Sequence, residues 1–182
     1  MAKLSPTDWV KAGINQLKEF GPQGISGEQV ARRLDVTRGS FYHHFPSMDH
    51  YIELLIQEWE TTQTIEVVNK AHEGGEVTEQ MMSLMESAWN SDAELEIAMR
   101  QWAFSNKRVR ESVERADRMR LAYIQAIYTT LVNDGTKGPK LGKLAYYGLL
   151  GALHRWPRIG KEELKNLILE IQDLLTNHQN ET

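Results

Sequence analysis

The chain has 182 residues, of which 41% are apolar and 25% charged, and this balance is typical of a folded globular protein. Its 21 Lys and Arg against 25 Asp and Glu give a net charge of −4, so the overall charge predicts neither nucleic-acid nor membrane binding, and the absence of cysteine excludes disulfides and thiolate chemistry. Because no apolar run approaches the ~20 residues of a spanning helix and the N-terminus has no signal-peptide core, we expect a cytoplasmic protein without a membrane partner.

Three short helices are predicted at the N-terminus. The run Ser5-Pro6-Thr7-Asp8 offers a capping hydroxyl, a proline for the first turn and a carboxylate three residues after the cap, so a helix begins there. Gly21-Pro22 ends it, because glycine suits a helix C-terminus and proline cannot continue the helix. Ser26 caps a second helix, and Thr37 caps a third that Pro46 stops.

The apolar residues of the remaining chain also recur at helical spacing. A longer helix is expected from Ser47 to the Gly74-Gly75 turn. Further helices are expected over residues 78–90, 91–105, 107–132, 139–156 and 161–177. Because no stretch alternates polar and apolar residues, we predict an all-α fold of about nine helices. We divide it into an N-terminal three-helix domain, residues 1–46, and a larger helical domain, residues 47–182.

Residues 26–45 have the layout of a helix-turn-helix, in which a short helix and a turn position a second helix to enter the major groove of DNA. Arg38 suits a bidentate contact with guanine, Ser40 suits several base edges, and Tyr42 suits a thymine methyl or a phosphate. Thr37, at the start of this helix, suits a phosphate. The positions left available on the second helix are Arg38, Gly39, Ser40, Tyr42, His43 and His44.

Other interpretations of this segment remain open. The run Phe41-Tyr42-His43-His44-Phe45 also fits an aromatic corner of the core. Adjacent residues on a helix point about 100° apart, so the paired histidines are poorly placed to bind one metal ion. The sequence also has no phosphate loop, zinc-protease helix or nucleophile elbow. We therefore predict no catalytic site, no metal and no cofactor.

The run VARRLDVTRGSFYHHFPS, from Val30 to Ser47, together with Trp9 and Ala12 in the first helix, resembles the DNA-binding domain of the tetracycline-repressor (TetR) family of bacterial transcriptional regulators. The likeness covers residues 7–56 and is weak afterwards. This resemblance implies an all-helical homodimer whose N-terminal domain binds operator DNA. Its larger C-terminal domain is then expected to bind a small-molecule effector and to dimerise.

The resemblance also implies roles for single residues. By motif position, Arg38, Gly39, Ser40 and Tyr42 are expected to face base edges, while Thr37, His43 and His44 hold the sugar-phosphate backbone. One departure is visible. Where the family often has a lysine soon after the Pro-Ser step, this chain has Met48 followed by Asp49.

The C-terminal part is rich in aromatic and thioether side chains. Such residues are most often plain core, but together they also suit an apolar ligand chamber with a few polar groups. No charged residue is assigned to this chamber, so the charge of the effector is not predicted. The candidate ligand-binding residues are Trp59, Gln63, Met85, Trp89, Trp102, Tyr123 and Tyr147.

Cations and carboxylates are interleaved at three- and four-residue spacing between Lys107 and Arg120. This spacing favours ion pairs along one exposed helix over a second DNA contact. In the fold that the resemblance implies, the loop before this helix lies near the DNA-binding unit. Asn106 and Lys107 are therefore expected to belong to the relay between ligand and DNA.

The last two predicted helices carry a narrow apolar seam. An intramolecular core is one explanation, but we favour a dimer interface in which two helices from each copy form a four-helix bundle across a twofold axis. The two recognition helices should then lie roughly 34–36 Å apart, matching successive major grooves of a near-palindromic operator. The predicted interface residues are Leu149, Ala152, Leu153, Leu164, Leu167, Ile168, Ile171 and Leu175.

The sequence thus predicts a ligand-responsive transcriptional regulator, specifically a repressor that holds double-stranded operator DNA as a homodimer and is released by a small, mostly apolar effector. The alternative is a helical ligand-binding or protein-interaction module with reduced or lost DNA binding. Met48 and the modest charge of residues 1–50, which contain six Lys or Arg and five Asp or Glu, favour this alternative. Salt-dependent binding to a defined duplex distinguishes the two.

Overall fold

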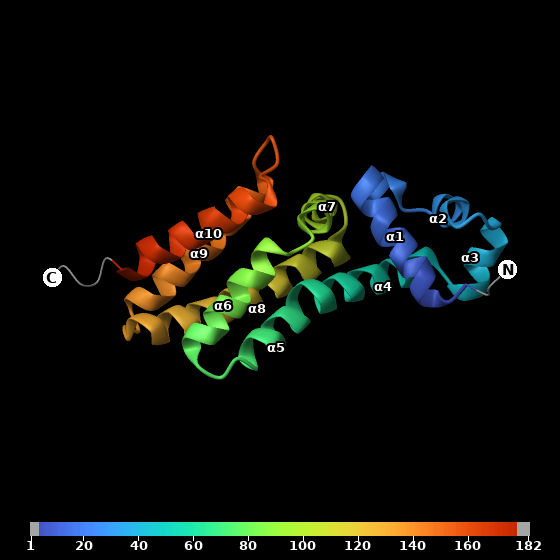
Figure 1. The fold of residues 1–182 in the computed structure, drawn as a ribbon. Coiled ribbons are helices and arrows are strands. Elements are labelled where there is room, and N and C mark those ends of the chain that lie inside the picture. The colour runs from blue at the N-terminus through green and yellow to red at the C-terminus, as the bar shows by residue number, and fades with distance from the viewer. Residues whose placement is uncertain (1–3, 178–182) are drawn as a thin grey trace. The chain divides into compact units, whose positions relative to one another are not determined.

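The computed structural model describes residues 4–177, and every regular element within that range is helical (Figure 1). The predicted all-α fold is confirmed, with no strand between residues 4 and 177. In chain order the elements are α1 (Pro6–Phe20), the 3-10 turn η1 (Pro22–Gly24), α2 (Gly27–Arg33), α3 (Arg38–His44), α4 (Met48–Glu60), the π-helical turn η2 (Thr61–Ile65), α5 (Glu66–His72), α6 (Val77–Trp89), α7 (Ala93–Ala103), α8 (Lys107–Val132), α9 (Lys137–His154) and α10 (Lys161–Asn177).

Local side-chain caps explain where the first helices begin. Ser5 Oγ accepts from the backbone N–H of Asp8 at 3.3 Å, while Asp8 Oδ2 accepts from the backbone N–H of Ser5 at 2.8 Å, which completes the predicted capping box. Ser26 and Ser47 each accept from the backbone N–H three residues later, at 3.2 and 3.1 Å. Thr37 is the N-cap residue of α3, as predicted, but its side chain makes no capping hydrogen bond.

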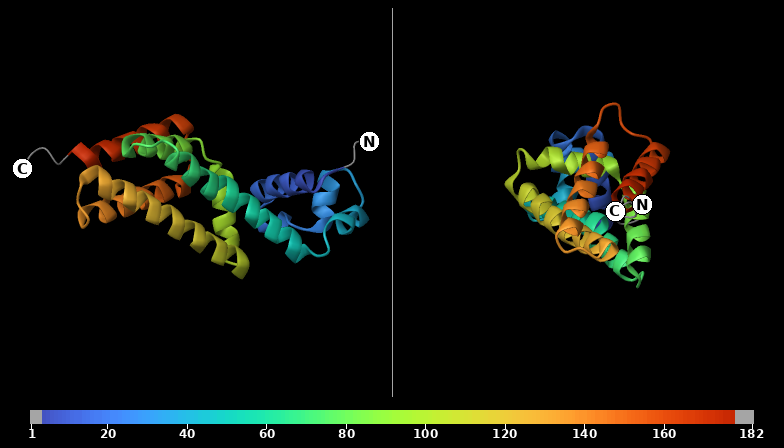
Figure 2. Two further views of the ribbon diagram at one scale, coloured as in Figure 1. Left: turned by 90° about the horizontal axis from the view of Figure 1, so that it is seen from below. Right: turned by 90° about the vertical axis from the view of Figure 1, so that its left-hand side faces the viewer.

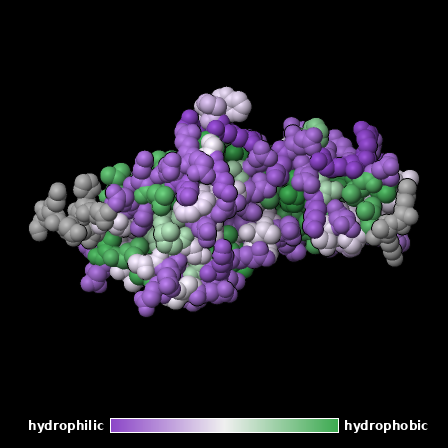
Figure 3. Space-filling model, in the orientation of Figure 1, coloured by the Kyte–Doolittle hydropathy of each residue, from purple (hydrophilic) through white to green (hydrophobic). Residues whose placement is uncertain are grey.

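The described helices form two compact units. The first comprises residues 4–62 and 93–114, and the second comprises residues 63–92 and 115–177. The described part of the predicted N-terminal domain, residues 4–46, lies within the first unit. On the face shown in Figure 3, hydrophilic side chains cover most of the surface of each unit, with smaller apolar areas between them.

In the first unit, α1 packs against α2, α4 and α7, and α2 packs against α3 (Figure 2). The shared core contains the fully buried side chains of Trp9, Leu17, Val30, Leu55 and Trp59. Burial of each such large side chain stabilises the fold by about 1.5–3 kcal/mol, so this core fixes α1 and α4 behind the two short helices.

In the second unit, α6 packs against α5 and α10, and α9 packs against α10. Met81 and Met85 of α6 form its buried centre with Ile127 and Tyr128 of α8. Tyr128 Oη donates to Gln172 Oε1 of α10 at 2.5 Å, and burial raises the pKa of Tyr128 to about 12, so this phenol stays a neutral donor.

The long helix predicted from Ser47 is interrupted by one wider turn. The π-turn η2 joins α4 to α5 without breaking the helical path. In a π-turn the backbone hydrogen bonds join residues five apart instead of four. Here Arg120 of α8 donates from Nη2 to the Gln63 carbonyl at 3.0 Å and from Nε to Thr64 Oγ1 at 2.9 Å.

Candidate nucleic-acid interface

Helix α3 is held in place by an aromatic cluster. Phe41 and Phe45, on its inner side, are buried and contact Trp9 of α1, with ring centroids 5.6 and 6.0 Å apart. Tyr51 of α4 closes the cluster, 5.0 Å from Phe41 and 4.9 Å from Phe45. Its hydroxyl donates to the Trp9 carbonyl at 2.7 Å. Two helices, α1 and α4, therefore fix the orientation of α3.

The turn between α2 and α3 is tight and is closed by backbone hydrogen bonds. Asp35 adopts a left-handed conformation with φ of 54°, which aspartate tolerates better than most residues. The Val36 N–H donates to the Ala31 carbonyl at 3.0 Å, closing the turn back onto α2. At the start of α2, a Cβ on Gly27 would lie 2.9 Å from the Phe41 ring, so glycine permits the close packing of the two helices.

The outer side of α3 presents most of the predicted DNA-binding residues. Thr37, Arg38, Gly39, Tyr42 and His43 are exposed, and Ser40 and His44 are half-buried. The aromatic-corner interpretation therefore holds for Phe41 and Phe45 but not for Tyr42, which is 46% exposed. The structure brings the seven predicted residues together on one helix and its N-cap.

Two side-chain pairs order this surface. The Arg38 guanidinium lies over the Tyr42 ring, 5.6 Å from its centroid. A hydrogen bond with the Tyr42 side chain is the main cause that raises the pKa of Arg38, so its guanidinium stays a cation. Thr37 Oγ1 and Ser40 Oγ are 3.2 Å apart, within hydrogen-bond distance. A Cβ on Gly39 would meet only Thr37 Oγ1, at 3.7 Å, so the backbone there is open to close approach.

The two histidines differ in their surroundings. His44 stacks at a tilt against Trp9, with centroids 5.7 Å apart, whereas His43 faces outward. Within residues 4–177, no group of three or more His, Asp or Glu side chains is arranged to hold a metal ion.

The first turn of α4 adjoins α3. Asp49, the residue at the departure from the family pattern, is bound by Arg108 of α8, with Arg108 Nη2 3.1 Å from Asp49 Oδ2. The expectation that the loop before α8 lies near the DNA-binding helices agrees with this contact, since Arg108 is two residues beyond Asn106. The Lys107 ammonium pairs instead with Glu111 of the same helix, at 3.7 Å.

The family model for bacterial regulatory proteins of the tetR family matches residues 10–53, which run from within α1 through α2 and α3 into α4. Residues 10–53 thus match the N-terminal domain of the TetR family. The resemblance inferred from the run between Val30 and Ser47 is thereby confirmed.

Solved structures extend the likeness to the whole TetR-type fold. A transcriptional regulator from Rhodococcus sp. Rha1 has 19% identity and a TM-score of 0.74, covering 96% of this chain and 97% of its own. A TetR-family regulator from Marinobacter aquaeolei VT8 has 17% identity and a TM-score of 0.74, covering 96% and 90%. The fatty acid degradation regulator FadR from Bacillus halodurans has 17% identity and a TM-score of 0.70, covering 99% of both chains.

No curated protein matches the sequence. None of the described helices has the length and apolar character needed to cross a membrane.

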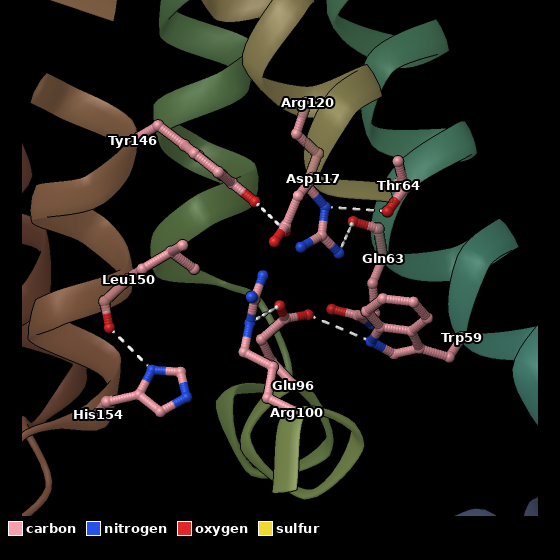
Figure 4. Close-up of polar contacts among 10 residues, drawn as sticks. All are labelled: Trp59, Gln63, Thr64, Glu96, Arg100, Asp117, Arg120, Tyr146, Leu150 and His154. Carbon is pink, nitrogen blue, oxygen red and sulfur yellow. Dashed lines mark hydrogen bonds and ion pairs between the residues drawn. The ribbon is translucent and has the colours of Figure 1, made fainter. Parts of the chain in front are cut away.

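The predicted ligand-binding residues are divided between the two units of the TetR-type fold. In the first unit, Trp59 is fully buried and its Nε1 donates to Glu96 Oε2 at 3.1 Å, while Glu96 Oε1 accepts from Arg100 Nε at 2.8 Å (Figure 4). Trp102 is also buried there. Glu96 is only 4% exposed, and no sequence pattern had marked it as a buried charge.

In the second unit, Met85 belongs to the buried centre, and Trp89 and Tyr123 pack against it. Gln63 contributes its carbonyl to Arg120. Tyr147 is 51% exposed, with the Lys143 ammonium 5.6 Å above its ring. The structure therefore brings Met85, Trp89 and Tyr123 together and leaves Tyr147 outside that core.

A polar group that the sequence did not predict lies in the same unit (Figure 4). Tyr146 of α9 is buried and its Oη donates to Asp117 Oδ1 of α8 at 2.6 Å. Burial raises the pKa of Tyr146 to about 12, so it donates as a neutral phenol. One turn further along α8, Arg120 binds Thr64 of the π-turn.

The predicted dimer seam is partly covered by its own chain. Ala152, Leu153 and Leu164 are buried, and Ile168 and Leu175 pack against the Met85 and Tyr128 cluster. The remaining seam residues, Leu149, Leu167 and Ile171, are half-buried. The large apolar side chains of α9 and α10 that are exposed are Leu144, Tyr147, Leu169 and Leu174.

Proposed function

We propose that this chain is a transcriptional repressor that binds a near-palindromic operator as a homodimer and is released by a small, mostly apolar effector. The exposed side of α3, held on the buried cluster of Trp9, Phe41, Phe45 and Tyr51, carries this proposal. A rigidly supported helix that offers a guanidinium, hydroxyls and a phenol matches the chemistry of the major groove.

In this proposal Arg38, Gly39, Ser40 and Tyr42 meet base edges. Arg38 is the residue best suited to specify a base, because a guanidinium forms two parallel bonds to guanine. Thr37, His43 and His44 contact the sugar-phosphate backbone, which sets the position of the helix without reading sequence.

The test is selection of duplexes from a random pool by the full-length chain, followed by titration of the selected duplex. Arg38→Ala is expected to lose preference at one base pair in each half-site, at a cost of about 1–3 kcal/mol. Arg118→Ala, an exposed arginine further along α8, is the matched control and should keep the selected sequence. If both variants select the wild-type sequence, α3 does not read DNA.

The homodimer is proposed to form through α9 and α10. The exposed residues Leu144, Tyr147, Leu169 and Leu174 support this, because large apolar side chains on the outside of two neighbouring helices gain by burial. Sedimentation should give a dimer for the wild type and a monomer for Leu174→Glu. The matched change Ile65→Glu, at an exposed position of η2, should leave the dimer intact.

The effector is proposed to contact the apolar side chains around Met85, Trp89 and Tyr123. Their mixture of thioether, indole and phenol groups suits a compound that is mostly apolar with one or two polar atoms. Release requires that the effector bind one conformational state more tightly than the other. A compound that raises the melting temperature of the chain and lowers its affinity for the selected duplex would support this step.

A second candidate is a module of the same fold that no longer binds DNA. It is favoured by Asp49, whose carboxylate lies in the first turn after the recognition helix, and by the pairing of Arg32 with Glu28 and Arg33 with Glu19. Absence of any salt-dependent duplex binding by the wild-type chain would select this candidate.

A further inference from the structure

The helix-turn-helix domain has few cations for the DNA backbone. Its described cations are Lys11, Lys18, Arg32, Arg33 and Arg38. Arg32 pairs with Glu28 at 2.8 Å, Arg33 with Glu19 at 2.6 Å, and Lys18 with Glu94 at 3.9 Å. Neutralisation of phosphates supplies much of the affinity of a DNA-binding protein. A repressor built on this domain therefore gains from cations that other elements bring to the same surface.

Arg108 of α8 is such a cation. Its Nη2 lies 3.1 Å from Asp49 Oδ2, in the first turn of α4. Only three residues separate α4 from the end of α3, so this turn lies beside the recognition helix. Arg110 donates to the carbonyls of Ala103 and Phe104 at 3.0 and 3.1 Å, which fastens the loop that precedes Arg108.

The pair between Arg108 and Asp49 is open to solvent. The two side chains are 55% and 70% exposed, and an exposed ion pair contributes only about 0–1 kcal/mol. A guanidinium has five N–H donors, so it can bind a phosphate while it keeps one bond to a carboxylate. The phosphates of B-DNA line both edges of the major groove, so an element beside the reading helix faces them.

We propose that Arg108, which lies outside the helix-turn-helix, contacts a backbone phosphate of the operator beside the first turn of α4. This inference rests on the proposed DNA-binding function. It gives Asp49 the role of a positioning residue, because its carboxylate holds the guanidinium at the edge of the reading surface. In this proposal Arg108 supplies the phosphate-binding cation at the place where the family often has a lysine and this chain has Met48 followed by Asp49.

The experiment measures the affinity of full-length variants for the duplex that the wild type selects and for an unrelated duplex of equal length, between about 50 and 200 mM salt. The variants are Arg108→Ala, Asp49→Ala, the double variant, and Arg118→Ala as the control arginine on the same helix. Thermal unfolding checks that each variant is folded.

Loss of one phosphate contact lowers the slope of log affinity against log salt by about 0.9, so a homodimer that loses two contacts changes its slope by about 1.8. This corresponds to a loss of up to about 60-fold in affinity at 0.1 M salt. We expect Arg108→Ala to weaken binding to both duplexes with the base preference unchanged, and the double variant to stay weak. Arg118→Ala should keep the wild-type slope.

Two outcomes would overturn the inference while leaving the proposed function intact. One is an unchanged salt slope in Arg108→Ala although Arg38→Ala loses base preference. The other is wild-type affinity in the double variant, since Arg108 would then serve only to neutralise Asp49. If the wild type binds no duplex at all, the proposed function and the inference fail together.

Discussion

Gly13 is the position where one added carbon should disturb the recognition helix most directly. A Cβ at this position would lie 2.1 Å from Tyr51 Oη and 2.9 Å from Leu55 Cδ2, both fully buried. The hydroxyl cannot move away freely, because it donates to the Trp9 carbonyl at 2.7 Å. Gly13→Ala must therefore displace Tyr51 and with it the aromatic cluster that supports α3.

The cost follows from three opposing effects. Overpacking of a buried site costs about 1–3 kcal/mol, and an unsatisfied buried hydrogen-bonding group costs about 1–3 kcal/mol. Alanine in a helix regains about 1 kcal/mol relative to glycine. We expect Gly13→Ala to lower the free energy of unfolding by about 3 kcal/mol, measured by urea unfolding with tryptophan fluorescence as the signal, and to weaken binding to the selected duplex.

A double-mutant cycle tests the mechanism. Tyr51→Phe removes the atom nearest to the new carbon, so Gly13→Ala should cost at least about 1 kcal/mol less in that background. Gly39→Ala is the control, since its Cβ would meet only Thr37 Oγ1 at 3.7 Å and should not lower stability. Additive costs of the Gly13 and Tyr51 changes, within about 0.5 kcal/mol, would refute the proposed clash.

Three further predictions concern Tyr42, Glu96 and two glycines of α9. Tyr42→Phe should keep the base preference set by Arg38, because the ring beneath the guanidinium remains. Tyr42→Ala should relax this preference in a duplex selection. Equal effects of the two variants would show that the ring does not order the guanidinium. Glu96→Gln should destabilise the chain by about 2–4 kcal/mol in urea unfolding, because a neutral amide cannot accept from both Trp59 and Arg100 as the carboxylate does. Unchanged stability would show that the charge is dispensable. Gly138→Ala should lower the melting temperature more than Gly142→Ala, since its Cβ would lie 2.3 rather than 2.8 Å from the α8 backbone. A lower melting temperature for Gly142→Ala than for Gly138→Ala would contradict this packing.

The fold and the reading surface were predictable because their signals are local. Ser5, Ser26 and Ser47 each act on a backbone group within three residues, so the sequence alone locates these helix starts. The alternation of inward Phe41 and Phe45 with outward Tyr42 follows from helix geometry once the turn at Asp35 is recognised.

The apolar seam of α10 shows where such reasoning stops. An apolar stripe predicts that one side of a helix is buried, but it does not predict which element or which chain buries it. The structure covers Ile168 and Leu175 with α6 and α8 of the same chain, whereas Leu174, about 100° further around the helix, stays exposed. The predicted interface therefore stays a prediction, because a stripe covered within its own chain does not show what a second copy would contact.

The partners of the α8 cations were only partly predicted, for a related reason. Spacing predicted ion pairs within the helix, and Lys107 with Glu111 is one. Arg108 instead binds Asp49, which is distant in sequence. Arg110 binds the backbone carbonyls of Ala103 and Phe104, which no side-chain spacing predicts. Arg120 binds the Gln63 carbonyl and Thr64 Oγ1 in the π-turn η2. Since no residue pattern announces that turn, these partners of Arg120 follow from tertiary structure alone.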